Sequence, residues 1–245
     1  MGFSPEETER YARQIVLKGF GGTAQQALKA ARVLVVGAGG LGSPAIAYLA
    51  GAGVGTIGIA DNDAVSVTNL QRQILFDVAS VGRSKAETAA AFALALNPMI
   101  AVKTHTARIE AGNAGGIVEG YDIVLDGTDN LPTRRVVAGA CAEQGKILVS
   151  GAVSMIDGQV TVLVPHLKRA DGTAMPGFSA LYDAGASDAD LPSCEANGIL
   201  GPVTGVIGTL MAAEAIKVIT GIGEPLIGRV LLYEAKAARF TEIGL

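Results

Sequence analysis

The sequence predicts an α/β fold, in which a Rossmann-like, mostly parallel sheet with helices on both faces is followed by a C-terminal, mainly antiparallel strand segment. Strand-like runs of β-branched residues recur, and alanine-rich, helix-like stretches fill most of the intervals between them, which is typical of parallel strands joined by helices. The runs lie at 32–37, 56–61, 101–106, 121–127 and 147–152. After Gly151 the pattern changes to a strand-like run, a polar connection, an apolar helix and two closing strands, at 158–165, 165–193, 203–221, 229–235 and 238–243.

Length and composition bound the organisation and the partners. The 245 residues are compatible with one domain, and 49% hydrophobic against 17% charged residues, with a mean hydropathy of +0.40, are enough for a large core. The net charge of -4 and the lack of a basic run argue against nucleic acid and membrane surfaces as partners. The stretch 203–221 contains a glutamate and a lysine, so we expect a buried or interface helix rather than a membrane span. Two cysteines and an N-terminus without a signal-peptide pattern indicate a cytoplasmic protein.

Capping signals predict where two helices begin. Ser4, Pro5 and Glu7 form an N-cap, a first-turn proline and a capping-box acid, so a helix that carries Arg13 begins there. In "SKAETAAAFALALNP", Ser84 is the cap, a glutamate follows three residues later, and Asn-Pro ends the helix.

A glycine-rich turn follows the first predicted strand. Gly37, Gly39 and Gly42 match the pattern G-x-G-x-x-G, with Gly40 inside it, so a phosphate can approach the backbone N–H groups that begin the next helix. Asp61, at the end of the second strand, is placed to accept hydrogen bonds from a ribose diol. Ribose recognition is the same for NAD and ATP, so this pattern leaves both open.

Polar residues further along favour a triphosphate. Beyond Asp63 come Asn69, Arg72 and Gln73, and Lys85 begins the next predicted helix. Two cations and an amide behind a nucleotide turn suit a triphosphate whose α-phosphorus is attacked, because its negative charge must then be neutralised. The alternative for each cation alone is an ordinary solvated surface charge.

A third group of polar residues follows the fourth predicted strand, which ends at Asp126. Asp129 and Asn130 lie in the turn that opens the next helix, at the carboxyl edge of the sheet, where ligands of such folds bind. A carboxylate there could hold Mg²⁺ that bridges the phosphates. Asp129 could instead be the N-cap of the helix, and so could Asn130; one acid can serve only one of these roles.

Together these stretches resemble the MoeB, ThiF and HesA group of ubiquitin-activating-like adenylyltransferases. "RYARQI", "GAGGLGSP", "NLQRQIL", "VGRSK", "DGTDN" and "GPVTGVIGTLMAAEAIK" occur in the family's order over nearly the whole chain. The resemblance implies a homodimer that uses MgATP to adenylate the C-terminal glycine carboxylate of a small ubiquitin-like sulfur carrier of the MoaD or ThiS type, ending in Gly-Gly, for molybdopterin or thiamine biosynthesis. It also implies a helical arm at 1–30, a nucleotide-binding part at 31–151 and a part for carrier binding and dimerisation at 152–245.

The resemblance also implies roles for individual residues. Asp61 would contact the ribose, Arg72 and Lys85 the phosphates, and Asp129 the magnesium ion, while Arg13 would reach the ATP of the partner subunit. The carrier's own carboxylate is the nucleophile, so adenylation needs no side-chain base, and the protein's task is positioning and charge stabilisation.

The sequence departs from the family at its zinc site. Most members carry two C-x-x-C pairs that bind a structural zinc; here Gly177 and Ala180 stand at the positions of the first pair, and no second pair follows. Cys141 and Cys194 alone cannot form a tetrahedral thiolate site, so we expect no zinc. The connection 165–193 must then be held by packing or remain mobile.

The remaining nucleophiles leave alternatives open. Cys194 aligns with a cysteine that links to the activated carrier in ThiF-like members, and a thiolate there could attack the acyl-adenylate; a loop residue without a role is the alternative. Cys141 fits a helix core. His105 and His166 fit structural or surface positions, which weakens an NAD-dependent oxidoreductase as a candidate. The main rival is a catalytically inactive nucleotide-binding scaffold of the same fold, and any sulfur donation would need a separate sulfurtransferase.

Overall fold

The computed structural model describes residues 2–183 and 198–245. Within these residues, strands form one sheet in the order β3-β2-β1-β4-β5-β6-β7-β8. In chain order they are β1 (Arg32–Val36), β2 (Thr56–Ala60), β3 (Ala101–His105), β4 (Ile123–Asp126), β5 (Ile147–Ser154), β6 (Asp157–Leu163), β7 (Arg229–Glu234) and β8 (Arg239–Gly244). Each strand-like run of the sequence forms one of these strands.

The sheet changes character at β5. From β3 to β5 all neighbouring strands are parallel, and β1 lies between β2 and β4, with Val36 paired to Ala60 on one side and to Asp126 on the other. One edge of β5 pairs with parallel β4 as far as Ser150, while the other edge pairs with antiparallel β6. The pairs β6–β7 and β7–β8 are also antiparallel. The predicted fold class is therefore confirmed.

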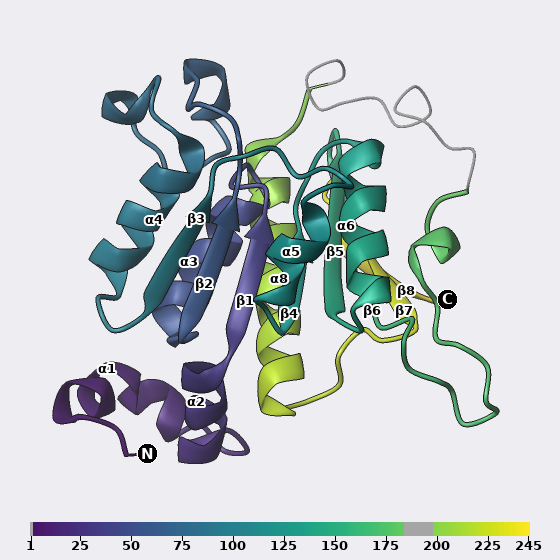
Figure 1. The fold of residues 1–245 in the computed structure, drawn as a ribbon, viewed down its shortest axis with the longest axis horizontal. Coiled ribbons are helices and arrows are strands. Elements are labelled where there is room, and N and C mark those ends of the chain that lie inside the picture. The colour runs from purple at the N-terminus through teal and green to yellow at the C-terminus, as the bar shows by residue number, and fades with distance from the viewer. Residues whose placement is uncertain (1, 184–197) are drawn as a thin grey trace.

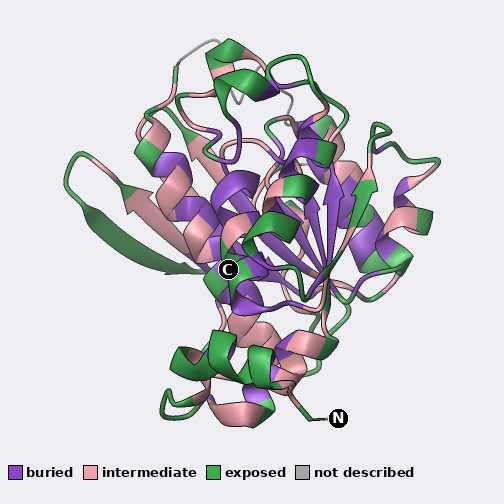
Figure 2. Ribbon diagram, turned by 90° about the vertical axis from the view of Figure 1, so that its left-hand side faces the viewer, coloured by how far each residue is buried: buried purple, intermediate pink, exposed green. Residues whose placement is uncertain are grey.

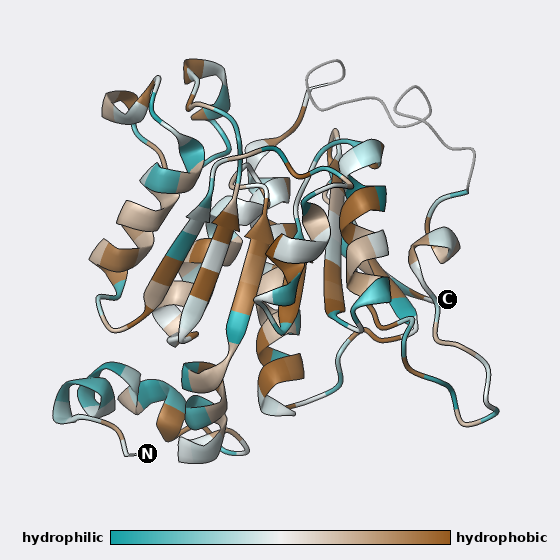
Figure 3. Cartoon of the chain, in the orientation of Figure 1, coloured by the Kyte–Doolittle hydropathy of each residue, from teal (hydrophilic) through white to brown (hydrophobic). Residues whose placement is uncertain are grey.

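Helices cover both faces of the sheet (Figure 1). They are α1 (Pro5–Ile15), α2 (Gly21–Ala30), α3 (Gly42–Ala52), α4 (Lys85–Leu96), α5 (Ala114–Glu119), α6 (Leu131–Glu143) and α8 (Gly201–Thr220), with the short 3₁₀ turns η1 (Val67–Asn69), η2 (Val78–Ser80) and η3 (Phe178–Ala180). Alternate residues of β1 enter opposite cores: Val33 and Val35 pack in the core of α3, α4 and α8, and Leu34 and Val36 in the core of α5 and α6. Because both faces are covered, the central strands are buried and apolar (Figures 2 and 3).

The apolar helix α8 packs on α3, β5 and β6. Among the described residues it is the one helix whose length and composition would allow it to cross a membrane. Its buried residues include Ile207 and Met211, at 0% exposure, and Glu214, whose carboxylate accepts a hydrogen bond from the backbone N–H of Leu226 at 2.8 Å. These contacts make α8 part of the core, as we expected for this stretch.

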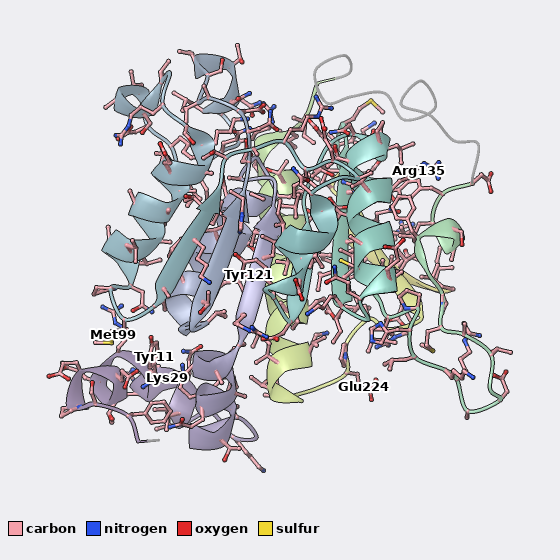
Figure 4. The ribbon with its side chains drawn as sticks, in the orientation of Figure 1. Tyr11, Lys29, Met99, Tyr121, Arg135 and Glu224 are labelled. Carbon is pink, nitrogen blue, oxygen red and sulfur yellow. The ribbon has the colours of Figure 1, made fainter. Side chains whose placement is uncertain are left out.

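The predicted N-terminal helix is confirmed and is firmly attached. Ser4 and Glu7 form the predicted capping box of α1. The hydroxyl of buried Tyr11 accepts a hydrogen bond from the Asn97 side chain at 2.9 Å, and Glu7 pairs with Lys29 of α2 at 2.6 Å. Figure 4 shows Tyr11 and Lys29 in this arm, at the end of the molecule away from the carboxyl ends of the parallel strands.

Candidate active site

A cleft of about 960 Å³ lies at the carboxyl ends of the parallel strands. It is lined by the turns that follow β1, β2 and β4, by the end of β5, and by residues of β6, β7 and β8. The chain leaves β1 for β2 on one side and returns to β4 on the other, so the cleft opens where the strand order reverses, the usual ligand position in such folds.

The glycine turn has the shape that phosphate binding requires. Gly37 has φ +86°, and a Cβ there would lie 3.1 Å from the carbonyl oxygen of Gly127, so the turns after β1 and β4 touch. A Cβ on Gly42 would lie 1.9 Å from the carbonyl oxygen of Gly37, which excludes any side chain where α3 begins. Gly39 and Gly40 line the cleft itself. Gly37 and Gly42 thus shape the turn, and Gly37, Gly39 and Gly40 line the cleft.

Asp61 lies at the cleft, and its carboxylate already accepts two backbone hydrogen bonds. Its Oδ2 accepts the backbone N–H of Ala38 at 2.8 Å, and its Oδ1 accepts that of Asp63 at 2.9 Å. Burial raises the pKa of Asp61, while these two hydrogen bonds and the nearby Lys85 charge oppose that rise. A carboxylate has about four lone-pair sites, so sites remain for hydroxyl donors of a ligand.

The predicted phosphate-binding side chains are gathered in the same cleft. Arg72 and Lys85 both line it. Lys85 pairs with Asp63 at 2.8 Å, and Nη1 of Arg72 donates to the Thr68 carbonyl at 3.2 Å. Gln73 is 4% exposed, and its Oε1 has no hydrogen-bond partner among the residues described. The cleft thus holds two cations and an amide with an unused acceptor.

The turn after β4 resolves the choice between Asp129 and Asn130. The side chain of Asn130 accepts the backbone N–H of Thr133 at 3.0 Å and is the N-cap of α6. Asp129 is exposed at the cleft and is not needed for this cap. Residues 2–183 and 198–245 contain no group of three or more His, Cys, Asp or Glu side chains that could hold a metal. A magnesium ion at Asp129 would therefore take its other ligands from phosphate oxygens and water, as Mg²⁺ commonly does.

The individual residues of the other half of the cleft were not predicted. It is lined by side chains from the antiparallel strands and the loops beside them: Asp157, Gln159, Tyr182, Tyr233, Glu234, Arg239 and Thr241. Gln159 donates to the Tyr182 hydroxyl at 3.0 Å, and Tyr233 stacks on Phe240 with ring centroids 4.7 Å apart. The residues on β6, β7 and β8 come together through strand pairing, and Tyr182, which follows η3, joins them through its hydrogen bond with Gln159. The resemblance placed carrier binding in 152–245 but singled out none of these residues.

Two predicted site residues, Arg13 and Asn69, are not at the cleft of this chain. Arg13 is exposed on α1, in the arm at the other end of the parallel strands. Asn69 does not line the cleft; its backbone carbonyl accepts the N–H groups of Arg72 and Gln73 and so shapes the loop that carries them. Cys194 lies outside the described residues. The roles of all three stay predictions.

The other cysteine is buried, and one histidine is half-buried on β3. Cys141 is buried in the core of α6, and burial raises the pKa of its thiol to about 12, so it is not a nucleophile at neutral pH. Nε2 of His105 lies 2.8 Å from the Tyr121 hydroxyl, and burial lowers the pKa of His105.

The segment at the position of the family's first cysteine pair is held by packing as far as residue 183. η3 lies against α6, and the Phe178 and Tyr182 rings contact each other with centroids 5.0 Å apart. The Arg135 guanidinium, labelled in Figure 4, lies 5.8 Å from the Phe178 ring and donates to the Asp183 carbonyl at 2.8 Å. The rest of the connection, to residue 193, lies outside the described residues.

The doubly wound sheet and its glycine-turn cleft define a Rossmann-like nucleotide-binding α/β protein. Comparison with known families makes this specific: the model of the ThiF family matches residues 11–245. The chain belongs to the ThiF family.

Curated relatives match nearly the whole chain. The chain is 45% identical over 242 residues to a probable adenylyltransferase/sulfurtransferase MoeZ of Mycobacterium tuberculosis, covering 99% of this chain and 61% of that protein. It is 43% identical to a sulfur carrier protein adenylyltransferase of Thermus thermophilus, covering 99% and 89%. It is 40% identical to the SAMP-activating enzyme E1 of Haloferax volcanii, covering 97% and 85%. The chain thus spans about three fifths of MoeZ but most of the other two.

Solved structures share the fold at lower identity. A crystal structure of E. coli MccB with AMPCPP and MccA has a TM-score of 0.82 at 23% identity, covering 97% of this chain and 71% of that one. A structure of MccB with ATP has a TM-score of 0.81 at 23% identity, covering 96% and 71%.

Proposed function

We propose that this chain is an ATP-dependent adenylyltransferase that activates the C-terminal glycine carboxylate of a small ubiquitin-like sulfur-carrier protein. One observation carries the proposal: a single cleft joins the glycine turn, Asp61, Arg72 and Lys85 to an open groove on the antiparallel strands. The first half suits a nucleotide, and the second leaves room for an extended peptide end. The names of two relatives, sulfur carrier protein adenylyltransferase and SAMP-activating enzyme E1, support this substrate class.

The chemistry requires only groups that the cleft contains. A carboxylate oxygen of the carrier attacks the α-phosphorus, the bond from that phosphorus to the bridging oxygen breaks, and pyrophosphate leaves with the electron pair. No proton is transferred, so charge stabilisation and positioning are the tasks of the protein. Arg72 and Lys85 would contact the phosphates, with Lys85 exchanging Asp63 for a phosphate oxygen. Magnesium held by Asp129 would neutralise further phosphate charge.

Several further features belong to the same proposal. The protein acts as a homodimer in the cytoplasm, with Arg13 of one protomer reaching the nucleotide of the other. The carrier is of the MoaD or ThiS type and serves molybdopterin or thiamine biosynthesis, with sulfur supplied by a separate sulfurtransferase. Cys194 is a candidate for a covalent link to the activated carrier. Zinc has no role, because Gly177 and Ala180 offer no thiolates.

Pyrophosphate exchange into ATP tests the proposal. Purified protein and Mg²⁺ are combined with carriers of the MoaD or ThiS type that end in Gly-Gly, and with the same carriers lacking the last glycine. We expect exchange only with an intact tail. Tight ATP binding without exchange for any carrier would contradict the proposal and favour an inactive nucleotide-binding scaffold. Tight NAD binding without any response to MgATP, measured by calorimetry, would also contradict it.

A further inference from the structure

A buried ion pair lies beside the cleft, and the proposed reaction gives it no task. Arg134, on the first turn of α6, has a side chain that is 6% exposed and lines the cleft, and its partner Asp126 is 0% exposed. Their closest N–O distance is 3.5 Å. Removing two charges from water costs free energy that such a long contact recovers poorly, so the ion pair by itself is weak evidence for a stabilising role.

The guanidinium also connects two backbone segments. Its Nη2 donates to the carbonyl of Thr128 and to that of Gly151, the latter at 2.7 Å. Asp126 completes the arrangement, because its Oδ1 accepts the backbone N–H of Thr128 at 3.0 Å and the Thr128 hydroxyl at 2.7 Å. Thr128, in the turn after β4, is therefore hydrogen-bonded through its carbonyl oxygen, its backbone N–H and its hydroxyl.

These two segments belong to different halves of the cleft. Thr128 directly precedes Asp129, beside the glycine turn. Gly151 is the first residue of β5 beyond its pairing with β4, and Ala152, Val153 and Ser154 after it line the half formed with the antiparallel strands. A planar guanidinium presents its N–H groups in fixed directions, whereas a lysine ammonium is a rotatable point charge on a flexible stem.

We infer that Arg134 is a positioning residue that holds the nucleotide half and the peptide half of the cleft in register for attack on the α-phosphorus. The inference rests on the proposed function. A displacement of about 1 Å between reacting groups costs on the order of a hundredfold in rate, so such a connection has a direct kinetic consequence.

The test compares Arg134→Lys with the double variant Arg134→Met/Asp126→Asn, which removes both buried charges together. Arg135→Lys on the same helix is the matched control, because Arg135 does not line the cleft and its contacts described above go to Phe178 and Asp183. We expect both Arg134 variants to fold and to keep the KM for ATP within about twofold, while kcat for carrier-dependent pyrophosphate release falls about tenfold or more. Hydrogen exchange should become faster both at 128–130 and at 151–154.

Two outcomes would overturn the inference. If the double variant regains wild-type kcat, Arg134 only neutralises Asp126. If Arg135→Lys loses as much activity as Arg134→Lys, the effect is not specific to this position. Wild-type protein that is inactive with every carrier would instead overturn the proposed function. In that case the hydrogen-exchange data still test the role of Arg134. If the hydrogen-exchange rate of either segment is unchanged in the Arg134 variants, Arg134 does not couple the two segments.

Discussion

Two adjacent residues in the turn after β4 lie in different environments. Asn130 caps α6, and Asp129 faces the cleft. We expect Asp129→Ala to reduce pyrophosphate release by about a hundredfold or more, because phosphate charge loses its stabilisation, while the melting temperature is unchanged. Asn130→Ala should instead lower the free energy of unfolding by about 1 kcal/mol through loss of the cap. Kinetics and thermal melts of both variants check this, and a destabilised Asp129→Ala would contradict it.

The acid at the end of β2 predicts a pH effect on nucleotide binding. Burial raises the pKa of Asp61 above its ordinary 3.8. Only the ionised carboxylate accepts hydrogen bonds from both ribose hydroxyls, so ATP affinity should fall as the pH is lowered through this raised pKa. The effect on the free energy of unfolding runs in the opposite direction to the effect on ATP affinity. Because the pKa of Asp61 is raised in the folded state, the group stabilises the folded state below pH 3.8, and this contribution is lost as the pH rises through the raised pKa.

Calorimetric titration of ATP over an acidic pH series measures the binding effect. Asp61→Asn should bind ATP weakly and with a flatter pH dependence. Equal pH dependence in wild type and Asp61→Asn would show that another group titrates.

At the scale of elements, the sequence predicted what local patterns determine. The central strands appeared as β-branched runs because both of their faces are covered, and α1 and α4 appeared through their capping residues Ser4 and Ser84. The strand order, the pair of Lys85 with Asp63, and the contacts of Arg134 could not be predicted. Each of these depends on contacts between segments that are distant in the sequence and come together only when the strands pair. The spacing of side chains along the chain carries no information about such tertiary contacts.

The η3 segment yields a prediction about metal-independent stability. Phe178 is partly buried against α6, with Tyr182 and Arg135 around it. Phe178→Ala should lower the free energy of unfolding by roughly 2 kcal/mol, less than for a fully buried ring. A metal chelator should leave the melting temperature of the wild type unchanged, and metal analysis should find no stoichiometric zinc. Unfolding on addition of the chelator would contradict this account.

At the scale of the whole molecule, the arm carries Arg13 far from the cleft of its own chain. Its attachment through Tyr11 and Glu7 holds it in a defined position. In a symmetric dimer with Arg13 acting in the other subunit, Arg13→Ala and Asp129→Ala each lose activity. Mixed heterodimers contain one site with both residues intact, so random mixing should restore about a quarter of wild-type activity. Absence of any recovery in verified heterodimers would show that Arg13 does not act across subunits.

The contact between Gly37 and Gly127 joins turns that are far apart along the chain, and it exists only once β1 and β4 have paired. An incompletely folded chain therefore has no nucleotide site, and ATP binds only the native state. By mass action, nucleotide at a hundred times its Kd would add about 2.7 kcal/mol to the free energy of unfolding. ATP in the cell would then stabilise the folded state of this protein. As ATP falls towards its Kd, this stabilisation would decrease, and the chain would become more susceptible to proteolysis, while most sites were still occupied.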